Sequence, residues 1–207
     1  MTHPLFGSHR PLVAILRGIT PGEAAAVFDT LVEAGVTLIE VPLNSPEPFV
    51  SIEIMAKRAD GRAKVGAGTV LSASQVDSVK DSGGMLIVSP NADASVIGRT
   101  KALRLESYPG VFTPTEAFAA IAAGADALKF FPAELIGPAG IKAMKAVLPK
   151  DLPVLAVGGA NSGNFGAFIK AGCAGFGIGS FLYKPGASLA EIAERARELV
   201  AAFDAAA

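Results

Sequence analysis

The chain has 207 residues, of which 51% are hydrophobic and 18% are charged, and its formal net charge is −1. This length predicts one domain with a sizeable core, and the balanced charge gives no general attraction to nucleic acid or to acidic lipid. The two histidines, His3 and His9, precede every periodic segment, which argues against a His-based catalytic triad and against a His-rich metal site.

Short apolar segments rich in Val, Ile and Leu alternate with longer Ala-rich segments of helical periodicity. Thr20, Pro21 and Glu23 form a typical helix start, and Gly35 a typical helix end. The predicted strands are residues 12–17, 37–41, 64–69, 85–89, 103–107, 127–131, 153–157 and 175–179. The predicted helices are residues 21–34, 47–58, 72–82, 92–102, 113–123, 138–148, 164–171 and 188–203.

Eight strand–helix units with continuous apolar strands predict a (β/α)8 barrel. We expect a single barrel domain over residues 1–207, with residues 1–11 as an N-terminal extension. An open, doubly wound sheet is the rival fold, because the sequence holds no information on strand order. However, no Gly-x-Gly-x-x-Gly motif follows the first strand, where a dinucleotide-binding fold would place it.

Four polar residues interrupt the apolar strands at or near their carboxyl ends, namely Arg17, Glu40, Thr69 and Lys129. These ends face the active site in a barrel of this type. A buried charge without a partner is costly. Charges of both signs at one end of the barrel therefore predict a shared cavity.

Lys129 lies among apolar and aromatic residues in the segment Ala-Leu-Lys-Phe-Phe-Pro. Burial lowers the pKa of an amine, and the neutral amine can attack a carbonyl carbon. The structural alternative is a lysine that extends its ammonium group outward from a strand edge. Because lysine is rarely fully buried, we favour the nucleophile.

Glu40 and Arg17 each allow two interpretations. A carboxyl group among apolar residues has a raised pKa and can exchange protons near neutral pH, so Glu40 is a candidate general acid/base. Arg17 can bind a carboxylate or phosphate through two parallel hydrogen bonds. Alternatively, these two residues, or Glu40 and Lys129, form an internal ion pair that only stabilises the barrel.

Glycines at the ends of the last two strands predict a phosphate site. Gly158 and Gly159 end the seventh strand, while Gly179 and Ser180 end the eighth. Barrels often bind phosphate with the loops after these strands, where glycines let backbone N–H groups approach the oxygens. The alternative is that these glycines only make tight turns.

Together these segments resemble the small class I aldolases that cleave 2-keto-3-deoxy-6-phospho sugar acids. The resemblance covers nearly the whole chain, from about Val13 to the last helix. The matching segments are AILRG (14–18), EVPLNSP (40–46), GAGTV (66–70), SPN (89–91), LKFFP (128–132), AVGG (156–159) and GIGS (177–180). As a set they are highly specific, although no single segment would be.

The resemblance implies a Schiff-base aldolase without metal ion or cofactor, in which Lys129 forms the imine and Glu40 transfers protons. It implies a phosphorylated 2-keto-3-deoxy sugar acid as substrate, pyruvate and glyceraldehyde 3-phosphate as products, and a homotrimer. It places Arg17 and Thr69 near the substrate carboxylate and Pro90 in the pocket wall. The implied phosphate-binding residues are Gly158, Gly159, Gly179 and Ser180.

The family has two close branches whose substrates are epimers at C4. The EVPLNSP segment and Val157 before the glycine pair resemble the branch acting on 6-phosphogalactonate derivatives. The sequence KFFPAE at 129–134 is common in the 6-phosphogluconate branch, so the gluconate epimer is the alternative substrate. A threonine hydroxyl at position 157 could bond the C4 hydroxyl of one epimer, whereas valine cannot.

Two other classes of function fit a phosphate-binding barrel. A phosphosugar epimerase or isomerase would need paired acid–base groups but no imine, and a metabolite sensor would bind without turnover. The single cysteine, Cys173, excludes an intramolecular disulfide. With no signal-peptide pattern and no membrane-spanning stretch, this predicts a cytoplasmic protein that does not bind membranes.

Overall fold

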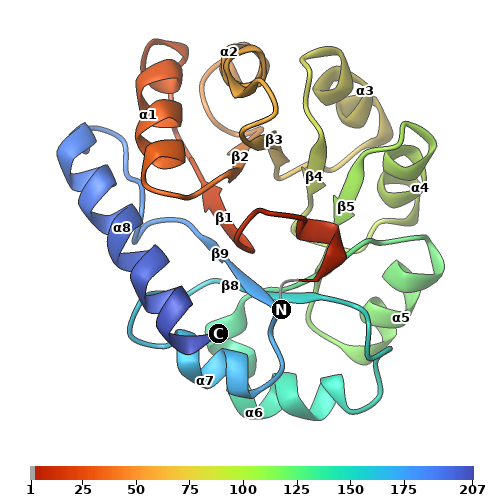
Figure 1. The fold of residues 1–207 in the computed structure, drawn as a ribbon. Helices are drawn as coiled ribbons and strands as arrows, with labels where there is room; N and C mark the ends of the chain where they lie inside the picture. Colours follow the sequence, from red (N-terminus) through yellow and green to blue (C-terminus); the bar gives the residue numbers. More distant parts are fainter. Residues whose placement is uncertain (1–2) are drawn as a thin grey trace.

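The computed structural model describes residues 3–207 and arranges its strands as a ring surrounded by helices (Figure 1). Within these residues nine strands pair in parallel, in the order β5-β4-β3-β2-β1-β9-β8-β7-β6. The strands are β1 Leu12–Ile15, β2 Leu38–Pro42, β3 Lys64–Gly68, β4 Leu86–Val88, β5 Glu106–Tyr108, β6 Gly110–Val111, β7 Leu128–Phe130, β8 Val154–Val157 and β9 Gly175–Ile178. The helices are α1 Pro21–Glu33, α2 Pro48–Ala59, α3 Ala73–Asp81, α4 Ala94–Ala102, α5 Pro114–Ala122, α6 Ala133–Lys145, α7 Phe165–Lys170 and α8 Leu189–Ala206.

Only Pro109 separates β5 from β6, so these two strands are halves of one chain segment. β5 pairs with β4, and β6 pairs with β7. The segment therefore closes the ring, which confirms the (β/α)8 barrel and excludes the open doubly wound sheet. Proline cannot donate to a strand ladder, and this accounts for the break at Pro109.

The fifth strand was predicted too early, at residues 103–107, whereas β5 begins at Glu106. Leu103 and Arg104 still belong to the end of α4, since their amides bond to the carbonyls of Arg99 and Lys101. Arg104 then adopts a positive φ of 58°, which ends the helix. The apolar character of Leu103 comes from packing of this helix end, not from a strand.

Helix α6 also differs from its prediction, which began at Pro138. The helix begins at Ala133, and Gly137 breaks it with φ 68° and ψ 165°. Pro138 therefore starts the second helical part, as proline does at a first helical position. The predicted cap of α1 is confirmed, because the Glu23 carboxylate accepts from both the N–H and the hydroxyl of Thr20.

The amino-terminal mouth of the barrel is closed by the short 3-10 helix η1, Pro4–Phe6, which lies in front of the strands in Figure 1. Phe6 is fully buried, and its ring lies edge-on to Tyr108 with a centroid distance of 6.4 Å. Around it, Lys64 pairs with Glu106, which also accepts from the Tyr108 hydroxyl. Part of the predicted N-terminal extension is thus a plug of the barrel.

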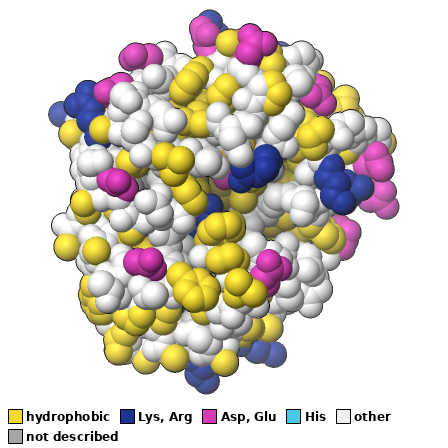
Figure 2. All heavy atoms as spheres, turned by 180° about the vertical axis from the view of Figure 1, so that it is seen from behind, with side chains coloured by type: hydrophobic (Ala, Val, Ile, Leu, Met, Phe, Trp, Pro, Cys, Tyr) yellow, Lys and Arg dark blue, Asp and Glu magenta, His cyan; other side chains and the backbone are white. Residues whose placement is uncertain are grey.

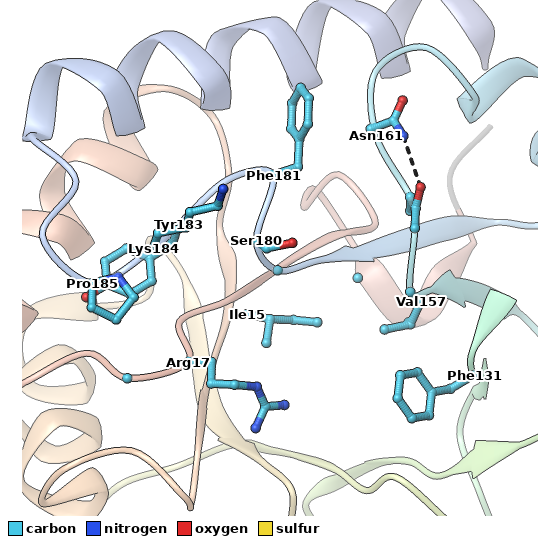
Figure 3. Close-up of a pocket in the computed structure, with 16 residues that line it drawn as sticks. Ile15, Arg17, Phe131, Val157, Asn161, Ser180, Phe181, Tyr183, Lys184 and Pro185 are labelled. Carbon is cyan, nitrogen blue, oxygen red and sulfur yellow. Dashed lines mark hydrogen bonds between the residues drawn. The ribbon is translucent and has the colours of Figure 1, made fainter. Parts of the chain in front are cut away.

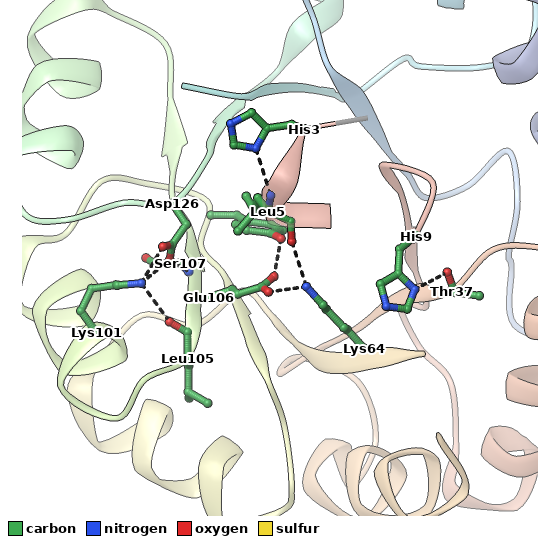
Figure 4. Close-up of polar contacts among 11 residues, drawn as sticks. His3, Leu5, His9, Thr37, Lys64, Lys101, Leu105, Glu106, Ser107 and Asp126 are labelled. Carbon is green, nitrogen blue, oxygen red and sulfur yellow. Dashed lines mark hydrogen bonds and ion pairs between the residues drawn. The ribbon is translucent and has the colours of Figure 1, made fainter. Parts of the chain in front are cut away.

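Both histidines lie at this plugged end (Figure 4). His3 Nδ1 accepts from the Leu5 amide at 3.2 Å, and His9 Nδ1 lies 2.8 Å from the Thr37 hydroxyl. The functional site must therefore lie at the other mouth, formed by the carboxyl ends of the strands. In the described part of the chain, no helix combines the length and apolar character needed to cross a membrane.

Candidate active site

Glu40 and Lys129 lie inside the barrel, on opposite sides of the ring. Glu40 is the middle residue of β2 and is 2% exposed, while Lys129 is the middle residue of β7 and is 7% exposed. Both side chains line one small internal pocket together with Tyr108 and Val157. The structure thus brings together the two residues predicted to carry the chemistry.

The Glu40 carboxyl group is buried without a full set of partners. Its Oε2 atom is enclosed and forms no hydrogen bond with the described residues. Burial raises the pKa of Glu40 to about 7, although the positive charges of Lys129 and Arg17 pull it downward. Such a carboxyl group can both accept and donate a proton near neutral pH.

The environment of Lys129 shifts its pKa in the opposite direction from that of Glu40. Burial lowers its pKa, the Glu40 carboxylate opposes this effect, and the nearby Arg17 guanidinium adds to it. The Nζ atom lies 4.7 Å from the centre of the Phe131 ring, two residues further along the chain. No ion pair within 4.0 Å joins Lys129 to Glu40. The amine is therefore not locked in the salt bridge considered above.

Arg17 lies beyond the end of β1 and forms no direct ion pair with Glu40 either. Its Nη1 donates instead to Asn44 Oδ1 at 2.6 Å. Asn44 belongs to the loop after β2, whose Ser45 hydroxyl accepts from the Gly18 amide at 2.9 Å. These two bonds join the β1 and β2 loops and hold the guanidinium at the mouth of the barrel.

A large cavity of about 800 Å³ opens above the internal pocket (Figure 3). It brings together the predicted residues Arg17, Val157, Gly158, Gly159, Gly179 and Ser180. Ile15, Val157 and Gly177 line both spaces. The cavity therefore leads from the surface toward Lys129 and Glu40, and Figure 2 shows that this face is hollowed near its centre, where Lys or Arg side chains lie.

Thr69 and Pro90 follow β3 and β4 and do not line either space. Thr69 adopts φ 56°, a strained conformation for a β-branched residue, directly after β3. Pro90 packs with its carbonyl against Gly110, where a β-carbon would collide with it. The structure thus puts both residues at the same mouth as the other predicted residues, but away from the cavity walls.

Backbone amides form a second feature of the cavity. The amides of Gly159, Ala160, Ser180 and Phe181 donate no hydrogen bond to any residue in the range 3–207. All four residues line the cavity, at the ends of the two adjacent strands β8 and β9. Backbone N–H groups without a protein partner in one cavity favour an anion.

Most of the other lining residues were not predicted from the sequence, and Phe131, Asn161 and Lys184 are among them. Phe131 could have been found, because residues two apart on a strand point to the same face and Lys129 was already a candidate. Lys184 follows Ser180 by four residues and adds a positive charge to the rim. Neither Lys184 nor Asn161 belongs to a motif that would have singled it out.

The family model described as KDPG and KHG aldolase matches residues 8–195. The chain belongs to this aldolase family. It is therefore a carbon–carbon lyase.

Individual relatives agree with the family match. A Rhizobium meliloti protein named "Probable 2-dehydro-3-deoxy-6-phosphogalactonate aldolase" is 52% identical over 98% of this chain and 95% of its own. The Escherichia coli 2-dehydro-3-deoxy-6-phosphogalactonate aldolase is 48% identical over 93% of this chain and 94% of its own. A solved structure described as native KDPGal superposes with a TM-score of 0.93, at 47% identity over 95% of each chain.

Proposed function

We propose that this aldolase cleaves 2-dehydro-3-deoxy-6-phospho-D-galactonate to pyruvate and D-glyceraldehyde 3-phosphate through a Schiff base on Lys129. The observation that carries the proposal is the burial of Lys129 and Glu40 in one pocket beneath a cavity lined by free backbone amides. An amine with a lowered pKa, a carboxyl group with a raised pKa and an anion site fit a phosphorylated keto acid. The two relatives compared above are both named for this substrate.

In the first half of the reaction, neutral Lys129 attacks the C2 ketone, and loss of water gives an iminium ion. Glu40 takes the proton of the C4 hydroxyl, directly or through a water molecule. The electrons of the C3–C4 bond move into the iminium as this bond breaks, which releases glyceraldehyde 3-phosphate and leaves an enamine. Because its pKa lies near 7, Glu40 is able to hold that proton until the next step.

In the second half, the enamine takes a proton at C3, and water hydrolyses the resulting imine. This releases pyruvate and restores the Lys129 amine. Arg17 binds the substrate carboxylate from the barrel mouth, where its bond to Asn44 holds it in place. Thr69 and Pro90 lie at the same mouth but outside the walls of the cavity and the internal pocket.

The phosphoryl group occupies the cavity end formed by Gly158, Gly159, Gly179 and Ser180. Gly158 and Gly159 have φ values of 94° and 73°, which side chains rarely adopt. A β-carbon at Gly159 would also lie 2.5 Å from Oε2 of Glu134. Both positions therefore require glycine for the turn that presents the amides.

Borohydride reduction in the presence of pyruvate tests the Schiff base. We expect the mass of the intact protein to rise by one reduced pyruvyl group, located on Lys129. The control variant Lys142→Ala, which removes an exposed lysine, should gain the pyruvyl group as the unmodified protein does. The variant Lys129→Ala should not gain it. Absence of an adduct on the unmodified protein, or equal labelling of Lys129→Ala, would contradict the mechanism and would favour an isomerase or a sensor.

Substrate preference is tested by cleavage of the two C4 epimers side by side. Val157 lines both the cavity and the internal pocket, and it offers no hydrogen bond to a C4 hydroxyl. We expect the galactonate derivative to have the higher kcat/KM. A higher value for the gluconate derivative would reverse the assignment while leaving the imine chemistry intact.

We further propose a homotrimer in the cytoplasm. Large apolar side chains remain exposed on one chain, with 45% of Phe112, 47% of Phe118 and 72% of Leu135 accessible. Contact with further copies would bury such surface. Light scattering should give three times the chain mass, and a single-chain mass would contradict the assembly.

A further inference from the structure

Two asparagine side chains hold one carbonyl group behind the glycine turn after β8. Asn161 Nδ2 donates to the Gly159 carbonyl at 3.0 Å, and Asn164 Nδ2 donates to the same oxygen at 2.9 Å. The remaining oxygens of both amides are also bonded. Asn161 Oδ1 accepts from the Gly163 amide, and Asn164 Oδ1 accepts from the Asn161 amide, each at 3.0 Å. These four bonds, here called the asparagine clamp, fix the orientation of both side chains.

The clamp fixes the amide on the other side of the same peptide unit. In a planar trans peptide the carbonyl and the following N–H point in opposite directions. Holding the Gly159 carbonyl toward the asparagines therefore turns the Ala160 N–H away from them. In Figure 3 the Asn161 amide reaches this carbonyl from the side away from Val157 and Arg17. The Ala160 N–H is one of the four amides without a partner in the described chain.

In this turn of two consecutive glycines, the Gly158 carbonyl accepts from the Glu134 amide at 3.2 Å, and the Gly159 carbonyl is held by the two asparagines. Glycine has more conformational freedom to lose than any other residue, so ordering the Gly158–Gly159 turn upon binding would weaken affinity. Bonds that already hold the turn in its binding conformation remove that cost. Preorganised donors also stabilise charge without rearranging during the reaction.

We propose that Asn161 and Asn164 are positioning residues that preorganise the Ala160 amide, at the end of the Gly158–Gly159 turn, for a dianionic phosphoryl group. This inference rests on the proposed function, because it deepens the assignment of the phosphate end of the site. The two asparagines act through the backbone, and neither donates its own amide to the phosphoryl group.

The variants separate the clamp from general loop stability. Asn161→Ala and Asn164→Ala each remove one donor to the Gly159 carbonyl without adding a charge to the cavity. The double variant Asn161→Ala/Asn164→Ala removes the clamp. Ser162→Ala is the matched control, since Ser162 lies between the asparagines and its hydroxyl bonds to Glu198 of α8 instead.

Inorganic phosphate is the first probe, followed through the NMR shifts of the Gly159 and Ala160 amides. We expect its Kd to rise about threefold or more in each single variant and about tenfold or more in the double variant, with Ser162→Ala unchanged. Phosphate binding within twofold of the unmodified protein in the double variant would overturn the proposal. This titration needs no turnover, so it judges the clamp even if the proposed aldol cleavage fails.

Exchange of the pyruvate methyl protons in D2O is the second probe, because it uses Lys129 and Glu40 without a phosphoryl group. We expect the double variant to exchange within twofold of the unmodified protein while its KM for the phosphorylated substrate rises about tenfold. A parallel loss of exchange would show a merely structural role and overturn the proposal. Absence of exchange in the unmodified protein would instead count against the proposed function.

Discussion

Gly68 of β3 leaves open the space that the carboxylate of Glu40 fills from the neighbouring strand β2. A β-carbon at Gly68 would overlap the carboxyl carbon and both oxygens of Glu40. Glycine within a buried strand usually weakens it, because it adds no packing and loses much conformational freedom. Here the missing side chain leaves room for a carboxyl group that faces the same internal pocket as Lys129.

Substitution Gly68→Ala should therefore displace Glu40 and lower kcat by about 10- to 100-fold, because small misplacements of catalytic groups have effects of this size. Steady-state cleavage kinetics measure the loss. Gly98→Ala is the matched control: Gly98 is exposed on α4, and a β-carbon there meets no atom within 4 Å. The control should keep full activity, and equal kcat values for both variants would show that Glu40 does not need this space.

The pH dependence of the rate should follow Glu40. Since the pKa of this group is about 7, its basic form accumulates as the pH rises through 7, and kcat/KM should rise with it. Glu40→Gln should lower turnover at least 100-fold and abolish this limb, while Lys129 still reacts with pyruvate and borohydride. An unchanged pH profile in Glu40→Gln would remove Glu40 as the base.

Stability should respond to pH through the same group, with the opposite preference. The folded state holds the Glu40 proton up to about pH 7, whereas the unfolded chain releases it near its ordinary value of 4.5. The folded state thus binds more protons between these values, and the contribution of Glu40 to stability is lost as the pH rises through this window. Urea unfolding at pH 5 and pH 8 should show a smaller fall for Glu40→Gln, and parallel falls would contradict this.

Val157→Thr should shift the epimer preference. A threonine hydroxyl at this shared wall of cavity and pocket adds a hydrogen-bonding group beside the path to Lys129. We expect the kcat/KM ratio of gluconate to galactonate derivative to rise about tenfold, the scale of one added hydrogen bond. Val157→Ala adds space without a hydroxyl and should leave the ratio within threefold; an equal shift in both variants would point to size instead.

Phe6→Ala should weaken the fold without touching the site. Phe6 is fully buried at the plugged mouth, so its truncation should cost about 3 kcal/mol or more of unfolding free energy. Leu5, the neighbouring residue, is half-buried, so Leu5→Ala should lower the free energy of unfolding by less. At a temperature where the variant stays folded, kcat should be normal, and a selective loss of kcat would show that the plug acts on the site.

Much of the fold follows from pattern, and its exceptions come from tertiary structure. The alternation of strands and helices predicts the barrel. No sequence pattern around Pro109 shows that the residues before it pair with β4 and the residues after it pair with β7. Leu103 has an apolar neighbourhood like that of a strand, and only the positive φ of Arg104 reveals a helix end. Pro138 predicts a helix start, and the earlier turn of α6 becomes visible only when Gly137 is seen to bend the chain.

The site residues likewise fall into those that the sequence predicts and those that only the structure reveals. Lys129 and Glu40 stand out in the sequence because a charge among apolar residues needs an explanation. Asn161 and Asn164 do not stand out, since their partner is a backbone carbonyl and any residue would supply one. The role of Gly68 is equally hidden, because the reason for the glycine is a side chain on another strand.

The chain segment around Pro109 affects the tendency of the protein to aggregate. The carbonyls of Ser107, Pro109 and Val111 accept from residues 127, 129 and 131 on one side, while β5 pairs with β4 on the other. Within residues 3–207 the sheet therefore has no terminal strand with a free row of donors and acceptors. Such a row is what allows foreign strands to add to a sheet and start aggregates. Because the ring is closed, it offers no such template, even though most of its strands are apolar.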